Sequence, residues 1–333
     1  MRSIKLLTVV LIVVMVLTLG LMISTPVVAV KGTYPGVNGK IAFSARVNNF
    51  WAIFIMNADG TNVQQLTDGT KYDVSPCWSP DGTKIAFGRA VQGAADQTIW
   101  VMNSDGSGLR QLTSGGYQTH PAWSPDGTRI MFDTEESGSN VGIYVIDANG
   151  PTGPGTLVIA GGHRPSWSPD GTKIVFVSSA PLAIAVADAN TWTVMATLAT
   201  GISPCWSPDG SKIVFQNTMG IISVMNADGL GMTPLNVNGD APNWSPDGTK
   251  IVFAKEEASV LIMNADGSEV HDLTPTMPSA AAPDWQRLPA AAPVGGFVEP
   301  VNKVAVLIPW LTIVGSVAAI SVVIAKSWKK PEN

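Results

Sequence analysis

Apolar residues fall in short alternating runs through residues 38–288, and each run ends in a cluster of Pro, Gly, Asp or Asn. The clearest runs have the pattern Ile-x-Phe and recur at residues 41–43, 85–87, 130–132, 174–176, 213–215 and 251–253. Alternation with a period of two, rich in β-branched and aromatic residues, is typical of β-strands with a buried face. No apolar stripe with the 3.6-residue period of a helix is visible there. The pattern predicts an all-β fold.

One phrase, Pro-x-Trp-Ser-Pro-Asp-Gly, precedes most of these runs. Its tryptophans lie 38 to 45 residues apart, at Trp78, Trp123, Trp167, Trp206 and Trp244, and a truncated copy ends in Trp285. A period of about 40–45 residues is that of a four-stranded propeller blade. Within each copy, Ser-Pro-Asp-Gly is a reverse turn because Pro fixes φ and Gly accepts a positive φ. Each complete copy therefore predicts four short strands.

The two ends of the repeat region complete one another. Residues 40–43, 53–56 and 63–67 correspond to strands two, three and four of a unit that lacks its first strand, and residues 283–285 supply a first strand alone. Five complete units and this divided one predict a six-bladed β-propeller over residues 38–288, closed by 3+1 strand pairing. Such closure removes free sheet edges at the seam.

Both ends of the chain carry long uncharged segments. Residues 1–29 begin with basic residues, continue in an apolar run and end in small residues, which predicts a secretory signal peptide, or a signal anchor because the run is long. Residues 304–325 contain no charge and are long enough to span a bilayer as a helix. Residues 289–303 are then a linker, and the basic tail 326–333 stays in the cytoplasm. This predicts a single-pass protein of the cell membrane with its propeller on the extracytoplasmic side.

The repeated phrase Trp-Ser-Pro-Asp-Gly-Thr-Lys-Ile-x-Phe resembles the WD40-like (PD40) repeat of the TolB-like propeller family, and the resemblance extends over residues 38–288. It implies a six-bladed propeller that binds protein partners. The repeat is also similar to the propellers of prolyl-oligopeptidase-type enzymes, although no hydrolase domain follows it here. Residues 293–310 resemble the C-terminal anchors of archaeal secreted proteins, which suggests an archaeal surface protein.

Charge and cysteine content narrow the classes of partner. A net charge of −5 argues against nucleic acid, whose partners carry a basic surface. Cys77 and Cys205 occupy the same position in two repeats that are three units apart. In a six-bladed ring they would face each other across the channel, too far apart for a disulfide, so we expect two free, buried thiols.

Propellers of this family usually bind ligands where loops gather at one mouth of the central channel. The resemblance therefore places the residues that precede each Pro-x-Trp at that mouth, and the ionisable ones are candidates for binding: Asp73, His120, His163, Arg164 and Asp240. Two histidines in neighbouring blades with carboxylates could hold a metal. Solvated loop residues without a chemical role are the favoured alternative, because three histidines in the chain offer few combinations that require a site.

No nucleophile, zinc or phosphate-binding motif occurs in the chain. We therefore predict no catalytic residue, metal or cofactor, and a monomeric, membrane-anchored propeller that is a scaffold for a protein or small-ligand partner. The long loops 88–98 and 133–141 favour a partner surface on the first three blades. Two alternatives remain: an extracytoplasmic enzyme, such as a metal-assisted sugar lyase or hydrolase with its site at the channel mouth, and a structural component of the cell surface.

Overall fold

A computed structural model of the protein describes residues 36–91, 96–134, 141–256, 258–277 and 279–288. The chain divides into two units, Met1–Ala290 and Ala291–Asn333, and all described residues belong to the first. The predicted signal segment (1–29), linker (289–303), membrane helix (304–325) and cytoplasmic tail (326–333) lie outside the described residues. Within the described ranges, no helix is long and apolar enough to cross a membrane.

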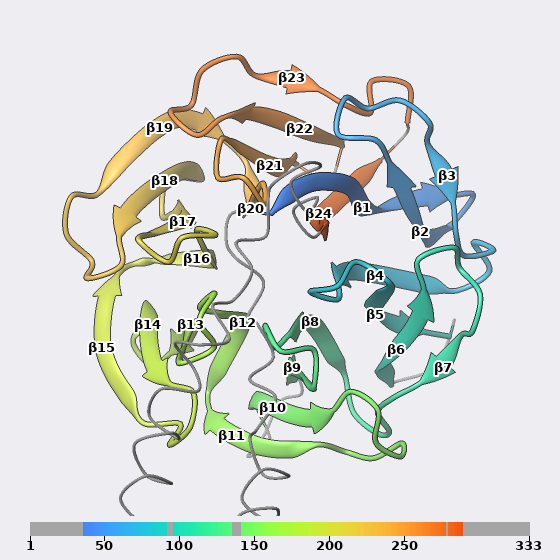
Figure 1. Ribbon diagram of the computed structural model, residues 1–333, viewed down its shortest axis with the longest axis horizontal. Helices are drawn as coiled ribbons and strands as arrows, with labels where there is room; N and C mark the ends of the chain where they lie inside the picture. Colours follow the sequence, from blue (N-terminus) through green and yellow to red (C-terminus); the bar gives the residue numbers. More distant parts are fainter. Residues whose placement is uncertain (1–35, 92–95, 135–140, 257, 278, 289–333) are drawn as a thin grey trace, which may run out of the picture. The chain divides into compact units, whose positions relative to one another are not determined.

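The described residues form strands and no helix, so the all-β prediction is confirmed (Figure 1). The first twelve strands are β1 (Val37–Val47), β2 (Phe50–Met56), β3 (Gln64–Gln65), β4 (Tyr72–Trp78), β5 (Lys84–Ala90), β6 (Gln97–Asn103), β7 (Arg110–Gln111), β8 (Gln118–Trp123), β9 (Arg129–Thr134), β10 (Gly142–Asp147), β11 (Thr156–Ala160) and β12 (Gly162–Trp167). The remaining strands are β13 (Lys173–Ser179), β14 (Leu182–Asp188), β15 (Val194–Ala199), β16 (Gly201–Trp206), β17 (Lys212–Asn217), β18 (Ile221–Asn226), β19 (Thr233–Asn238), β20 (Asp240–Trp244), β21 (Lys250–Lys255), β22 (Ser259–Asn264), β23 (His271–Asp272) and β24 (Ala280–Leu288).

The strands form antiparallel sheets that stand around a common centre. Four sheets have four strands each, β8–β11, β12–β15, β16–β19 and β20–β23. A larger sheet has the order β24-β1-β2-β4-β5-β6-β7, with β3 paired to β2. In Figure 1 the strands that end in the repeated tryptophan, such as β8 and β12, lie nearest the centre, and β11 and β15 lie outermost. The predicted propeller-like arrangement is therefore confirmed.

The core lies between neighbouring sheets. Five of the six repeated tryptophans end an innermost strand, Trp285 lies within β24, and all six are 5–9% exposed. One cluster joins Met131 and Ile143 of one sheet to Trp167 and Ile174 of the next. The phenylalanine of every Ile-x-Phe run is also buried. Because the cavity left by a truncated aromatic side chain fills only partly, replacing one of these tryptophans by alanine is expected to cost about 3–5 kcal/mol.

The Ser-Pro-Asp-Gly turns satisfy their own polar groups. In the first copy, the Ser79 hydroxyl donates to Asp81 Oδ1 at 2.6 Å, and the backbone N–H groups of Thr83 and Lys84 donate to Asp81 and to Ser79. Burial alone would raise the pKa of Asp81, but these hydrogen bonds from Ser79 and Thr83 bring it below its ordinary value. The turn is therefore stable without any ligand.

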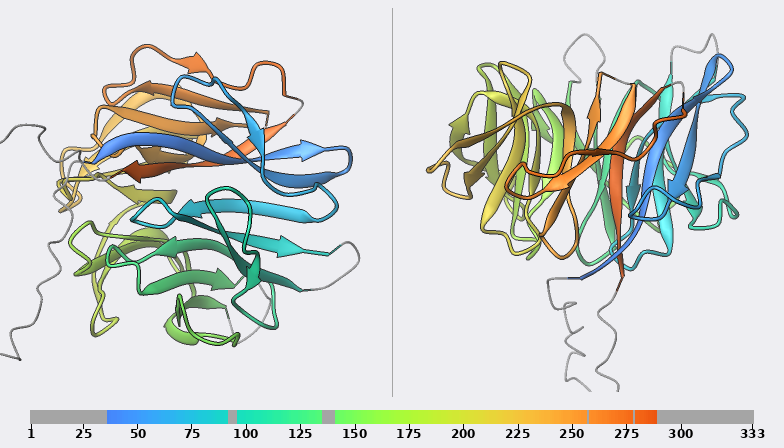
Figure 2. Two further views of the ribbon diagram at one scale, coloured as in Figure 1. Left: turned by 45° about the vertical axis from the view of Figure 1, so that its right-hand side comes forward. Right: turned by 90° about the horizontal axis from the view of Figure 1, so that it is seen from above.

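The first and last described strands are neighbours. β1 pairs with β24, and the register joins Val37 to Leu288 at one end and Ala45 to Ala280 at the other. Consequently the described chain begins and ends on the same side of the ring of sheets, as the right-hand view of Figure 2 shows. The starts of the innermost strands lie on the opposite side.

Candidate functional site

Every innermost strand bends at the residue that precedes its Pro-x-Trp. Six non-glycine residues there have a left-handed backbone with φ between 47° and 53°, namely Ser75, His120, Arg164, Ser203, Ala241 and Ala282. The pairing register shifts at the same point, for example between Val74 and Cys77. Such bulges redirect side chains. A left-handed backbone costs a non-glycine residue about 1–3 kcal/mol, and residues strained in this way cluster at functional sites.

These six residues line one central pocket of about 280 Å³. They come from the six strands β4, β8, β12, β16, β20 and β24, so each innermost strand contributes one residue to the same rim. We call this set the rim. The same backbone distortion in each innermost strand therefore places one side chain from each of the six strands around one opening.

A buried carboxylate organises one side of the rim. Asp133, which is fully buried on β9, accepts the backbone N–H of Arg164 at 2.8 Å. Its oxygens lie 3.1 Å from His120 Nδ1 and 3.8 Å from His163 Nδ1. The two histidines come from neighbouring sheets and keep a quarter of their side chains exposed. Asp133 therefore orients the His120 imidazole at the opening, and the His163 ring lies beside the same carboxylate without a hydrogen bond to it.

Arg164 links three neighbouring sheets across the rim. Its guanidinium donates to Ser203 Oγ at 2.6 Å and lies 3.6 Å from Asp240 Oδ1. Ser203 Oγ in turn donates to Asp240 Oδ1 at 3.0 Å. The side chains of Arg164 and Asp240 are 32% and 44% exposed, so this ion pair contributes little to stability and is open to exchange with a partner's charges.

Asp73 does not join this network. Its carboxylate is fully buried and accepts two hydrogen bonds from Arg89, at 2.6 Å and 2.7 Å. The Arg89 guanidinium also lies 5.1 Å from the ring centres of Phe87 and Trp100. The structure thus brings together four of the five candidates, His120, His163, Arg164 and Asp240, and engages the fifth in a buried ion pair.

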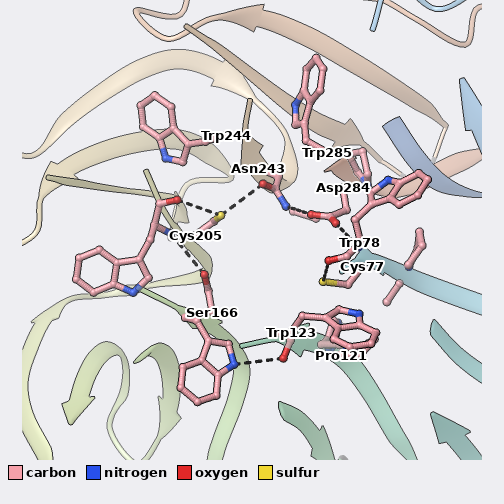
Figure 3. Close-up of a pocket in the computed structure, with 18 of the residues that line it drawn as sticks. Cys77, Trp78, Pro121, Trp123, Ser166, Cys205, Asn243, Trp244, Asp284 and Trp285 are labelled. Carbon is pink, nitrogen blue, oxygen red and sulfur yellow. Dashed lines mark hydrogen bonds between the residues drawn. The ribbon is translucent and has the colours of Figure 1, made fainter. Parts of the chain in front are cut away.

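The wall of the channel below the rim carries a second set of residues. It consists of the residue between Pro and Trp in each repeat, namely Cys77, Ala122, Ser166, Cys205, Asn243 and Asp284 (Figure 3). Asp284 accepts the backbone N–H of Trp78 at 2.7 Å and the side-chain amide of Asn243 at 2.5 Å. The Asp284 carboxylate faces the channel and is half-buried. Burial raises the pKa of Asp284 to about 6, against the lowering effect of these hydrogen bonds.

Both cysteines are free, as predicted, but they are half-buried rather than buried, because their side chains line the channel. Cys205 Sγ lies 3.6 Å from Asn243 Oδ1, and Cys77 lies beside the carbonyl oxygen of Trp78. Burial raises the pKa of Cys77 well above its ordinary value and that of Cys205 to about 11. A thiol that stays protonated is a poor nucleophile, so these cysteines line the channel as inert groups.

Of the two histidines, His120 is hydrogen-bonded to Asp133, and His163 Nδ1 lies 3.8 Å from that carboxylate, beyond hydrogen-bonding distance. Across the part of the chain that the structure describes, no group of three or more His, Cys, Asp or Glu side chains is arranged to hold a metal ion. Asp133 supports the rim through its hydrogen bonds with His120 and with the backbone N–H of Arg164.

Comparisons with known proteins identify the type of propeller repeat that the sequence pattern indicates. Residues 89–239 match the family described as the TolB β-propeller domain, PD40. The Tol-Pal system protein TolB of Geobacter metallireducens is 42% identical over 57 residues, which are 17% of this chain and 13% of that protein. That match thus spans a small part of the curated relative.

Solved propellers have a similar fold. TolB from Acinetobacter baumannii matches with a TM-score of 0.65 and 21% identity, over 74% of this chain and 66% of that one. A putative TolB from Agrobacterium tumefaciens matches with a TM-score of 0.56 and 20% identity, over 71% and 88%. A chain of a nidogen/laminin complex matches with a TM-score of 0.61 at 10% identity, over 74% and 98%. At these identities the similarity shows the fold alone.

Proposed function

The chain carries a TolB-like β-propeller of the PD40 type, and we propose that this propeller is a membrane-anchored, extracytoplasmic scaffold that binds a protein partner at its rim. The rim itself carries the proposal: six strained residues, one from each innermost strand, surround a single opening. A fold that needed these bends only for stability would place glycine at them. Ser, His or Arg stands at four of the six positions, where the strain presents polar side chains, and Ala241 and Ala282 occupy the other two.

The proposal takes the ring of sheets as six blades. β2 and β4 meet through one parallel pair, Trp51 with Tyr72, and a single parallel bridge between Gln97 and Tyr117 joins the next two sheets in the same way. We therefore count the larger sheet as two blades, β24-β1-β2-β3 and β4-β5-β6-β7. The pairing of β24 with β1 supports closure of the ring by the last strand.

The exposed, exchangeable pair of Arg164 and Asp240 suits a polar contact with a protein. The imidazoles of His120, which Asp133 orients, and of His163 add further hydrogen-bonding groups on the same side of the rim. Rigid polar groups held by buried partners lose little conformational entropy on binding, which favours specificity.

The experiment is affinity capture with the full-length protein in detergent against envelope extracts of its source cells. Arg164→Ala and His120→Ala should each reduce recovery of the partner about tenfold or more. Truncating an interface residue that carries much of the binding energy raises the free energy of binding by about 1–2 kcal/mol. His271→Ala is the matched control, because His271 is exposed on the outer strand β23. Equal recovery with all three variants would contradict binding at the rim.

A further inference from the structure

A second cavity lies between two neighbouring sheets, away from the rim. It has a volume of about 560 Å³, within the range of about 300–1,000 Å³ usual for ligand sites. We call it the crevice. The sheet β16–β19 contributes Asp209, Lys212, Val224, Thr233 and Leu235 to it, and the sheet β20–β23 contributes Trp244, Asp247, Ala265 and Asp266. It opens on the side of the Ser-Pro-Asp-Gly turns.

An arginine fills the corresponding space between two other sheets. Arg110, at the start of the outer strand β7, reaches across to the turn that follows β10. Its Nη2 donates to the carbonyl oxygen of Ala148 at 2.6 Å, and its Nη1 donates to that of Gly150 at 3.1 Å. This position between blades therefore accepts a guanidinium group.

Thr233 stands at the position of Arg110 in the later sheet. Arg110 follows an Asp-Gly turn by the same spacing as Thr233, at the first residue of β7 and of β19 respectively. The Thr233 hydroxyl donates to the carbonyl oxygen of Gly231 at 3.2 Å, within its own loop. Its side chain is too short to cross to the next sheet, so the space that Arg110 fills elsewhere stays open here.

The opposite wall of the crevice begins like the wall that Arg110 contacts. Ala265 follows β22 as Ala148 follows β10, and each is followed by a polar residue and a glycine. Ala265 and Asp266 line the crevice directly. The two turns differ at the glycine, because Gly267 has a left-handed φ of +88° and Gly150 does not, and Asp266 places a carboxylate where the earlier turn has Asn149.

The charge of the crevice favours a cation. Asp209, Asp247 and Asp266 line the crevice together with one ammonium group, that of Lys212. Hydrogen bonds from Ser268 hold the pKa of Asp266 below its ordinary value, and the nearby Lys250 ammonium also helps to lower it, so this carboxylate is ionised at neutral pH. The apolar side chains of Val224 and Leu235 line the same space. A basic head group on an apolar stem fits this combination.

We propose that the crevice binds the side chain of an arginine of a protein partner, in the position that Arg110 fills between the earlier sheets. The guanidinium group presents five N–H donors in a planar fork, which suits a backbone carbonyl oxygen and a carboxylate together. The crevice lies on the side opposite to the rim, so either site can fail in experiment without the other.

Calorimetric titration of the full-length protein in detergent with Nα-acetyl-arginine amide tests the proposal. We expect one binding site, at least tenfold weaker binding of the citrulline analogue, which has the same shape without the charge, and loss of binding in Thr233→Arg. Thr233→Val, which keeps the size of the side chain, should bind as the wild type does. Arg110→Thr should open the earlier position and raise the number of sites to two.

Two results would overturn the proposal. One is a Thr233→Arg variant that keeps the wild-type melting temperature and binds the arginine derivative unchanged. The other is a wild-type protein that binds the arginine and citrulline derivatives equally, or binds neither. Because Thr233→Arg adds a side chain at a surface position, its folding can be checked independently by thermal melting.

Discussion

The two ends of the innermost strands bend in the same way but use different residues. At the turn end, the left-handed positions are glycines with φ of 69–73°: Gly82, Gly127, Gly171, Gly210 and Gly248. At the rim, Ser, His, Arg and Ala adopt φ of 47–53°. Glycine takes this conformation without steric cost, whereas other residues lose about 1–2 kcal/mol. The turn end is thus built for stability, and the rim accepts strain to present side chains.

The carboxylates of the two regions differ in the direction in which their pKa values are shifted. The turn carboxylate Asp81 is held below its ordinary pKa by local donors. Asp284 lies on the channel side, where burial raises its pKa to about 6. Ionisation of Asp284 therefore destabilises the folded protein, whereas ionisation of the turn aspartates stabilises it. Four substitutions test this difference between the two regions.

The largest effect is expected from Asp284→Asn. The folded pKa of Asp284, about 6, lies above the unfolded value of 3.8, so its contribution to stability is complete below pH 4 and is lost as pH rises through 6. Two pKa units correspond to at most about 3 kcal/mol. An asparagine side chain cannot ionise, so this variant should gain up to that amount at pH 8 and little at pH 4, measured by urea unfolding. A variant less stable than the wild type at pH 8 would contradict the account.

Gly82→Ala should be the next largest change and should destabilise. An added Cβ would lie 2.8 Å from the backbone oxygen of Arg287 at a φ of +69°, so we expect a loss of about 2 kcal/mol. Gly115→Ala is the matched control, because it has a φ of +70° with open space around the new Cβ. A smaller loss at Gly115 separates the clash from the backbone strain, and equal losses would show that the clash is relieved.

Asp126→Ala tests a turn carboxylate and should cost about 1 kcal/mol at pH 7. Asp126 accepts hydrogen bonds from the Ser124 hydroxyl and from the N–H of Thr128. Burial alone would raise its pKa, but those hydrogen bonds lower it, so its contribution is present above the unfolded value and is lost as pH falls through the folded one. The difference between variant and wild type should therefore shrink below pH 4. A difference that grows in acid would count against this reading.

Ala241→Gly should have the smallest effect, a gain of about 0.5–1 kcal/mol, because glycine relieves the left-handed backbone at φ +47°. Ala196→Gly, at an exposed position of β15, should instead lose a similar amount. Differential scanning calorimetry of both variants checks the opposite signs. Loss of stability in both would mean that the rim is not strained.

Much of the fold was predictable because the repeat carries its own local signals. Pro, Asp and Gly fix each turn, and the tryptophan is large enough to require burial between sheets. The lengths of the outer strands were harder to predict. The hydroxyls of Thr67, Thr113 and Thr274 accept an N–H of the adjacent strand, and β3, β7 and β23 are two residues long. A Leu-Thr pair follows each of these three outer strands. The sheets that lack this pair have longer outer strands, β11, β15 and β19.

The candidate site was only partly predictable because its supports come from tertiary contacts. Spacing relative to Pro-x-Trp located His120, His163, Arg164 and Asp240. It could not show that Asp73 pairs with Arg89 from the next strand. Asp133 was missed, although an acidic residue directly after an Ile-x-Phe run is a signal of a buried polar group. Asp284 was visible only as the one charged residue between Pro and Trp.

Photo-crosslinking at the two ends of the innermost strands tests the central contrast most directly. A benzophenone amino acid would replace Ala282 at the rim in one protein, and Lys173, exposed beside a Ser-Pro-Asp-Gly turn, in another. If the rim binds the partner, we expect a partner to be crosslinked in cells from position 282 and not from position 173. Adducts from position 173 alone would contradict it.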